Sequence, residues 1–290
     1  MAASYAAFSQ LSLNGVRYDF HPSSMIGQRG EYRDTNGLRG NLQRSIERNL
    51  DTIYRVNGQI KTYPTPTELT TLWPILHGAA ASGTTYPLSS TGLTGYEYVA
   101  DRVAKVHTYA GVKVDRYNAG SSQGEAFAVD FDVVGTTESE GAAGTFASLS
   151  IDIATKPWMH HMLATTVAGT TFTPQSFGWE LNWNIDKDRF FNSQTLSTGT
   201  NATDMVVTVR AVYPYGDSAA IYTTHSASTG VQVVGTWTNG VYITTATFVK
   251  VAFTKMAPEI NSRGELMLVC EGQAMRSSST APLVLTMAVS

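Results

Sequence analysis

The chain has 290 residues and a net charge of −3, and only 15% of its residues are charged, well below the roughly 25% of an ordinary globular domain. The sequence lacks the basic stripe that sequence-independent nucleic-acid binding requires, and its single cysteine excludes an internal disulfide. Because no secretory signal and no run of about 18 apolar residues is present, we expect a soluble protein without a membrane span.

The first 60 residues are expected to form an extended arm, because glycines interrupt the segment repeatedly. Arginine is frequent here, and its planar guanidinium group suits paired hydrogen bonds to carboxylates. The arm is therefore expected either to present a solvated face or to contact acidic groups of a neighbouring subunit. The residues expected to make such inter-subunit or inter-ring contacts are Arg29, Arg33, Arg39, Arg44 and Arg48.

One helix is predicted over residues 66–77. Thr65 and Glu68 form a Thr-x-x-Glu capping box, with proline at the first helical position, and Gly78 is suited to end the helix. Pro74 is expected to kink or shorten it. The apolar face, which should pack against a sheet, consists of Leu69, Leu72, Trp73 and Leu76.

From residue 96 onward, apolar and polar residues alternate, as in strands with one buried and one polar face. The runs that show this are 127–133, 177–185, 205–210, 241–253, 266–270 and 283–289. A Ser-x-Gly-Glu turn occurs twice, at 122–125 and at 262–265, and each is expected to close a hairpin. The pattern predicts a mainly β fold, an antiparallel sandwich or barrel with one flanking helix and an extended N-terminal arm.

No catalytic or metal motif has the context it needs. The Gly-x-Ser-x-Gly at 120–124 precedes a strand pattern, whereas a nucleophile elbow precedes a helix. His160 and His161 are expected on a strand, where adjacent side chains point to opposite faces and do not share a metal. Cys270 lies in a strand pattern typical of a core residue. We therefore predict no catalytic residue, no metal and no cofactor.

Two further patterns have a structural and a chemical interpretation. Asp130 and Asp132 share one face of a strand, a spacing compatible with two carboxylates acting on a glycosidic bond, but common on half-exposed strands. Trp179 and Trp183 also share a face and could stack on sugars, although their clean alternation with polar residues favours core packing.

Several segments, spread over roughly residues 25–275, occur in a characteristic order. They are 27–30 with 46–48, 56–60, 64–69 with 73–78, the Ser-Gln-Gly-Glu hairpin with 129–135, 176–185, 257–260 and 263–266. In this order the chain resembles the tail tube (major tail) proteins of long-tailed bacteriophages. The resemblance implies a β-sandwich with a flanking helix, and a structural, non-enzymatic virion protein that self-assembles into stacked rings around a channel for DNA.

The same resemblance implies an organisation and a set of partners. We expect an arm at 1–60 and a tube domain at 61–290, and an internal duplication with halves at about 61–155 and 156–290 stays open. Rings of the family are usually hexamers, and some members fuse two units and close as pseudo-hexameric trimers. Expected partners are copies of the chain, a tape-measure protein, and terminator and baseplate proteins, in a virion tail assembled in the host bacterial cytoplasm.

A channel for DNA should be neutral to negative, so that DNA passes without specific binding. No Lys or Arg occurs between Arg116 and Lys156, and the lumen-facing candidates in this stretch are Glu125, Asp130 and Asp132. Two other classes of function stay open: another β-rich virion component, such as a capsid, connector or receptor-binding protein, and a hydrolase that uses the strand carboxylates.

Overall fold

The computed structural model describes residues 10–34, 49–142, 154–187, 202–216, 221–222, 230–260 and 266–289, without the side chains of 29–34 and 49–52. The first half of the chain contains β1 (Gln10–Leu13), β2 (Val16–Arg17), β3 (Met25–Asp34), β4 (Asn49–Thr62), α1 (Pro66–His77), β5 (Thr85–Tyr86), β6 (Tyr96–Asp101), β7 (Lys105–Ser122), β8 (Ala128–Gly135) and β9 (Thr137–Ala142). The second half contains a short 3₁₀ helix (His160–Met162), β10 (Leu163–Val167), β11 (Thr170–Phe172), β12 (Ser176–Asn182), β13 (Val206–Pro214), β14 (Val231–Asn239), β15 (Tyr242–Ile260), β16 (Leu266–Met275) and β17 (Leu283–Val289).

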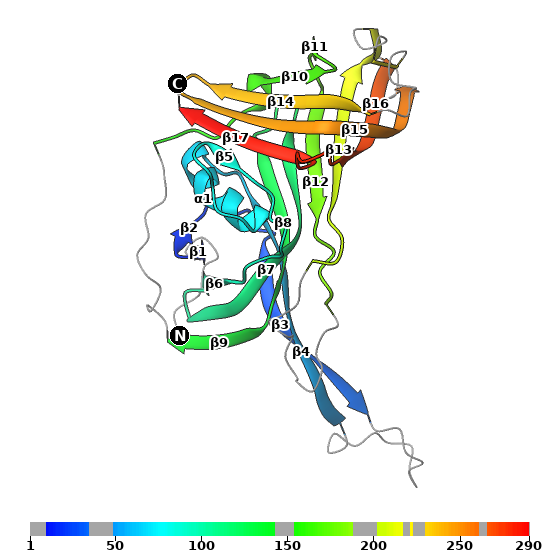
Figure 1. Ribbon diagram of the computed structural model, residues 1–290. Coiled ribbons are helices and arrows are strands. Elements are labelled where there is room, and N and C mark those ends of the chain that lie inside the picture. Colours follow the sequence, from blue (N-terminus) through cyan, green and yellow to red (C-terminus); the bar gives the residue numbers. More distant parts are fainter. Residues whose placement is uncertain are drawn as a thin grey trace.

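One antiparallel sheet connects both halves of the described part of the chain, and we call it the main sheet. Its order is β3-β4-β8-β7-β12-β13-β16-β15. Strands β7 and β15 are long enough to serve two sheets: their first parts pair with β6 and β9, and with β14 and β17, respectively. These outer layers and α1 cover one face of the main sheet (Figure 1). The predicted mainly β, antiparallel sandwich with one flanking helix is confirmed.

The pairing pattern of the first half recurs in the second half. In the β7–β8 hairpin the register shifts between Val114 and Arg116, and in β15–β16 it shifts between Phe253 and Lys255, 139 positions later. The β6–β7 pair shifts in β6 between residues 96 and 98, and the β14–β15 pair shifts in β14 between residues 231 and 233. A β-bulge occupies a specific position in a strand pair. Because the register shifts occur at corresponding positions in both halves, β6-β7-β8 and β14-β15-β16 are structural equivalents.

The remaining strands extend this equivalence. The β4–β8 pair corresponds to β13–β16, and the β3–β4 ribbon corresponds to β12–β13. The β1–β2 hairpin corresponds to β10–β11, and both have a two-residue turn of left-handed backbone, Asn14-Gly15 in one and Ala168-Gly169 in the other. The main sheet therefore consists of two four-strand sets, β3-β4-β8-β7 and β12-β13-β16-β15, which meet where β7 pairs with β12.

The helix forms where the local signals place it. Thr65 Oγ1 accepts from Glu68 N, the Glu68 carboxylate accepts from Thr65 N, and Gly78 ends the helix with φ 65°. Pro74 does not shorten the helix, which continues to residue 77. The apolar face packs on the main sheet, where the Trp73 ring lies 6.1 Å from the ring of Trp179.

Most apolar residues of the predicted strands are buried, whereas Val241 and Val289 are exposed. Trp179 and Trp183 are buried, so their assignment to the core is confirmed. The 122–125 turn closes the β7–β8 hairpin with Gly124 at φ 83°. The second Ser-x-Gly-Glu motif joins β15 to β16 and lies outside the described residues. The strand expected at His160-His161 is wrong: both residues belong to the 3₁₀ helix.

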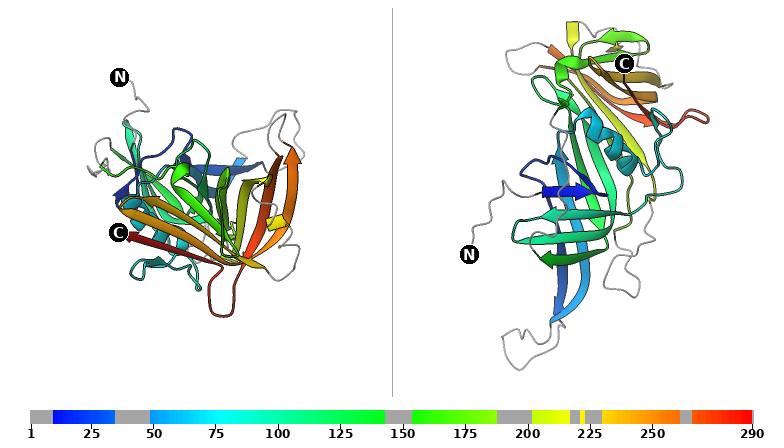
Figure 2. Two further views of the ribbon diagram at one scale, coloured as in Figure 1. Left: turned by 90° about the horizontal axis from the view of Figure 1, so that it is seen from above. Right: turned by 90° about the vertical axis from the view of Figure 1, so that its left-hand side faces the viewer.

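The β3–β4 ribbon projects from the body of the molecule (Figures 1 and 2). Its base is part of the core, because Ile26, Val56 and Ile60 are buried there, and the preceding β1 pairs with β6. The division into an arm at 1–60 and a domain at 61–290 stays a prediction. No helix among the described residues is long and apolar enough to cross a membrane.

Candidate assembly surface

The face of the main sheet opposite the core is polar. Cross-strand pairing aligns its side chains in rows, since directly opposite residues point to the same side. The rows are Lys61–Asp130–Asn118–Glu180–Thr208–Gln273, Gln59–Asp132–Arg116–Asn182 and Arg210–Glu271–Lys255. We call this surface the polar face.

Charges on the polar face compensate one another. Arg116 Nη2 lies 2.6 Å from Asp132 Oδ2, and this hydrogen bond raises the pKa of Arg116. Arg210 Nη2 lies 3.6 Å from Glu271 Oε1. The three rows together contain four cations and four anions, so these rows carry no formal net charge.

Asp130 is a partly buried acid of these rows. Burial raises its pKa, and the charge of Lys61, its cross-strand neighbour, opposes that effect. Its Oδ1 has no hydrogen-bond partner among the described residues. Asp130 therefore holds its charge less firmly than a fully solvated aspartate does.

The remaining lumen-facing candidate and the arm candidates do not belong to the three rows of the polar face. Glu125 is exposed in the turn after β7, at one end of the sheet, where its carbonyl accepts from His160 N. Arg29 and Arg33 belong to β3. Of the arm candidates, Arg39, Arg44 and Arg48 lie outside the described residues.

The serine motif contains a buried Ser–His contact that the sequence did not reveal. His160 Nε2 donates to the Pro174 carbonyl, so Nδ1 accepts from Ser121 Oγ at 3.1 Å. Ser121 Oγ accepts in turn from Trp237 Nε1. Because both Ser121 and His160 are buried, this contact fastens the 3₁₀ helix to β7 and offers no room for a substrate. Ser122, the central serine of the motif, ends β7 in an exposed position.

A second network joins α1 to the main sheet. His77 Nδ1 faces the Tyr86 carbonyl at 3.0 Å and must donate to it, so its Nε2 accepts from the Tyr117 hydroxyl at 2.8 Å. Tyr117 accepts in turn from Trp179 Nε1. Complete burial lowers the pKa of His77 to about 4. The described residues contain no cluster of His, Cys, Asp and Glu that could hold a metal ion.

An extended antiparallel sheet with a polar outer face and two terminal edges defines a β-protein suited to lateral association. A protein-family model described as "Phage tail tube protein" matches residues 6–274, and the chain belongs to this family. It is a structural component of the phage tail tube, located in the virion tail, and copies of the chain assemble into the tube. No curated protein matches the sequence.

Proposed function

We propose that the polar face lines the channel of the tube. The observation that supports this proposal is the charge balance of the three rows, because a surface without net charge neither retains nor repels a passing polyanion strongly. The opposite face is covered by α1 and the outer sheets, so the polar face is the broad side of the main sheet that is left to meet DNA. Asp130 and Asp132 belong to this lining, and Glu125 belongs to its rim.

The test uses the ion pair between Arg116 and Asp132. Asp132→Asn leaves Arg116 without its counter-charge in every copy of the chain, and we expect tubes of normal appearance but slower DNA ejection. The double variant Arg116→Gln/Asp132→Asn restores neutrality and should eject at the wild-type rate. Equal ejection rates in all three phages would contradict a channel position for this face.

We also propose that each chain contributes two tube units and that three chains close a pseudo-hexameric ring. The repeated strand pairing and repeated bulges support this arrangement, with units at about 10–142 and 163–289 in place of halves that begin at residue 61. A hexamer of whole chains would place twelve such units in one ring and widen the channel, because barrel diameter grows with strand number.

The β3–β4 ribbon is proposed to contact the adjacent ring. Removal of residues 27–60 would also remove buried residues of β4, so the informative variant replaces only residues 35–48 with a short Asn-Gly turn. We expect this variant to form rings that do not stack into long tubes. Tubes of normal length would refute the ribbon's role.

The remaining proposals concern partners and chemistry. We propose contacts with tape-measure, terminator and baseplate proteins, assembly in the host cytoplasm, and the absence of any catalytic role. Negative-stain microscopy of the purified protein separates the classes of function: hollow tubes or rings support the tube, closed shells or knobs support another virion component, and dispersed monomers support an enzyme.

A further inference from the structure

We propose that the free edge of β15 in one copy pairs with the free edge of β3 in the next copy, in the register that β7 and β12 use within the chain. The proposal rests on the ring assembly proposed above and specifies its interface. The ring partner is a second copy of this chain, bound head to tail, and such an interface generates a ring when its rotation closes.

The β7–β12 pairing within one chain is the template for this junction between two chains. Strand β7 ends the first four-strand set and β12 begins the second, and they pair antiparallel from Ser122↔Ser176 to Arg116↔Asn182. Strand β15 is the equivalent of β7, 139 positions later. Strand β3 is the equivalent of β12, 153 positions earlier, because Ile26↔Gly58 matches Trp179↔Val209. The contact that joins the two sets can therefore repeat between chains.

Transfer of the register specifies the residue pairs. Each β12 residue is replaced by its β3 equivalent and each β7 residue by its β15 equivalent. The resulting pairs within β3 and β15 are Met25↔Glu259, Ile26↔Pro258, Gly27↔Ala257, Gln28↔Met256 and Arg29↔Lys255.

Both edges are open in the part of the chain that the structure describes. Strand β3 pairs there only with β4, and residues 255–260 of β15 pair only with β16. An exposed edge presents unpaired N–H and C=O groups that can pair with a strand of another chain. Two of the most exposed large apolar side chains lie on these edges, Met25 at 66% and Ile260 at 79% exposure.

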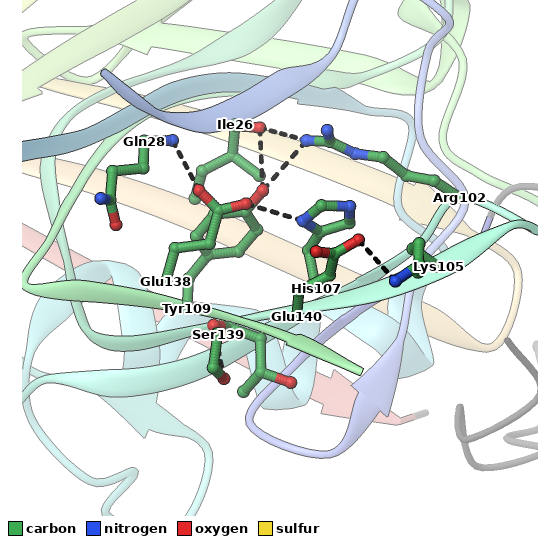
Figure 3. Close-up of polar contacts among 10 residues, drawn as sticks. Ile26, Gln28, Arg102, Lys105, His107, Tyr109, Glu138, Ser139 and Glu140 are labelled. Atoms are coloured by element: carbon green, nitrogen blue, oxygen red, sulfur yellow. Dashed lines mark hydrogen bonds and ion pairs between the residues drawn. The ribbon is translucent and has the colours of Figure 1, made fainter. Parts of the chain in front are cut away.

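The proposed register also agrees with the hydrogen bonding of the β3 edge. Pro258 has no N–H, so it cannot donate to the Ile26 carbonyl that it would face. That carbonyl already accepts from Arg102 Nη2 at 2.5 Å and from Tyr109 Oη at 3.2 Å (Figure 3). The two side chains thus supply the donors that the proline lacks, and the contact can persist in the ring.

A groove beside β3 has room and apolar lining residues for the side chains of the incoming strand β15. It has a volume of about 850 Å³ and is lined by Leu11, Phe20, Ile26, Tyr98 and Ala100, among others. In the internal junction the corresponding space holds the core-facing side chains of β7, such as Tyr117. The β15 equivalents that would enter the groove are Met256, Pro258 and Ile260.

One contact must open when the strands pair. Gln28 N donates to Glu138 Oε2 at 3.0 Å, and Glu138 Oε1 lies 2.7 Å from His107 Nδ1 (Figure 3). In the junction the Gln28 N–H faces the carbonyl of Met256 and is released by Glu138, which keeps its contact with His107. Glu138 therefore protects the β3 edge before assembly.

The experiment introduces one cysteine on each edge. Gly27→Cys/Ala257→Cys places two thiols directly opposite each other in the junction, and a Cβ at Gly27 meets no atom within 4 Å. Mild oxidation of the assembled full-length variant should produce intermolecular disulfides, resolved as covalent dimers and trimers on a denaturing gel. The native thiol does not interfere, because burial raises the pKa of Cys270 to about 12.

Three controls fix the interpretation. The internal pair Asn118→Cys/Glu180→Cys, which occupies the template positions, should form a disulfide within one chain. Gly27→Cys alone should remain monomeric on the gel. Gly27→Cys/Thr238→Cys, with its second thiol at an exposed position of β14, should also remain monomeric.

The outcomes separate the interface from the ring itself. Rings or tubes by microscopy without a disulfide between residues 27 and 257 would overturn the register and leave the tube function intact. A protein that forms no rings under any of these conditions would contradict the assembly and the interface together.

A substitution provides an independent readout. Ile260→Asp should leave the monomer folded, because the side chain is exposed, but should abolish ring formation measured by analytical ultracentrifugation. Val241→Asp is the matched control, an exposed apolar residue (51%) in the β14–β15 turn, and should form rings. Rings of Ile260→Asp at the wild-type concentration dependence would refute the proposed groove contact.

Discussion

Acid should destabilise this protein through His77. The imidazole is completely buried at the end of α1, donates from Nδ1 to the Tyr86 carbonyl and accepts at Nε2 from Tyr117. Protonation of Nε2 would break the second hydrogen bond and place a charge in an apolar core. Burial accordingly lowers the pKa of His77 from 6.5 to about 4.

The direction and size of the effect follow from proton linkage. Between pH 6.5 and 4 the unfolded chain binds a proton at His77 and the folded chain does not, so stability falls as the pH falls through this window. A pKa difference of 2.5 between the two states corresponds to about 3 kcal/mol, at about 1.4 kcal/mol for each pH unit. Above pH 6.5 His77 contributes no pH dependence.

Urea unfolding followed by tryptophan fluorescence, on the dispersed Ile260→Asp variant, measures this effect at pH 7, 6, 5 and 4. His77→Gln in the same background is the control, because it retains the acidic groups and removes only the imidazole. We expect the free energy of unfolding to fall more steeply with acid in the parent than in His77→Gln, by about 3 kcal/mol over the range. Equal slopes would refute the burial argument for His77.

Other predictions test the packing directly. Trp73→Ala should destabilise the fold by about 3–5 kcal/mol, measured by urea unfolding, because the ring is fully buried between α1 and the main sheet; a loss below 1 kcal/mol would contradict that packing. Gly120→Val should prevent folding or lower the melting temperature strongly, since a Cβ there lies 2.5 Å from the Gly178 backbone, whereas Gly27→Ala should melt like the wild type. Cys270 should not react with a thiol reagent at pH 8 until the protein unfolds, and rapid labelling of the native protein would contradict its burial.

The helix and most strands could be predicted because their signals are local. The capping box, the proline at the helix start and Gly78 specify α1 within fourteen consecutive residues, and alternation specifies strands such as β12. Strand β9 is not predictable in this way, because its sequence has no apolar alternation. It forms through pairing with β7 and through ion pairs such as Lys105–Glu140, and both depend on chain segments that are distant in sequence.

The candidate surface was predictable only in part. The common face of Asp130 and Asp132 follows from the period of a strand, but the pairing of Asp132 with Arg116 depends on a bulge in β7 that no local pattern announces. The two Ser-x-Gly-Glu motifs indicate a repeat, but they lie 140 positions apart in the sequence. The residue numbers of the equivalent strands β7–β8 and β15–β16 differ by 139. Only the strand register shows how far each repeat extends.

The central claim is that one chain carries two tube units joined by the same edge contact that joins neighbouring chains. Cryo-electron microscopy of assembled tubes, reconstructed without imposed symmetry, tests it most directly. We expect three chains in each ring, with β15 of each chain paired to β3 of the next and six nearly equivalent units around the channel. Six chains in each ring, or a seam between chains at any other pair of strands, would contradict it.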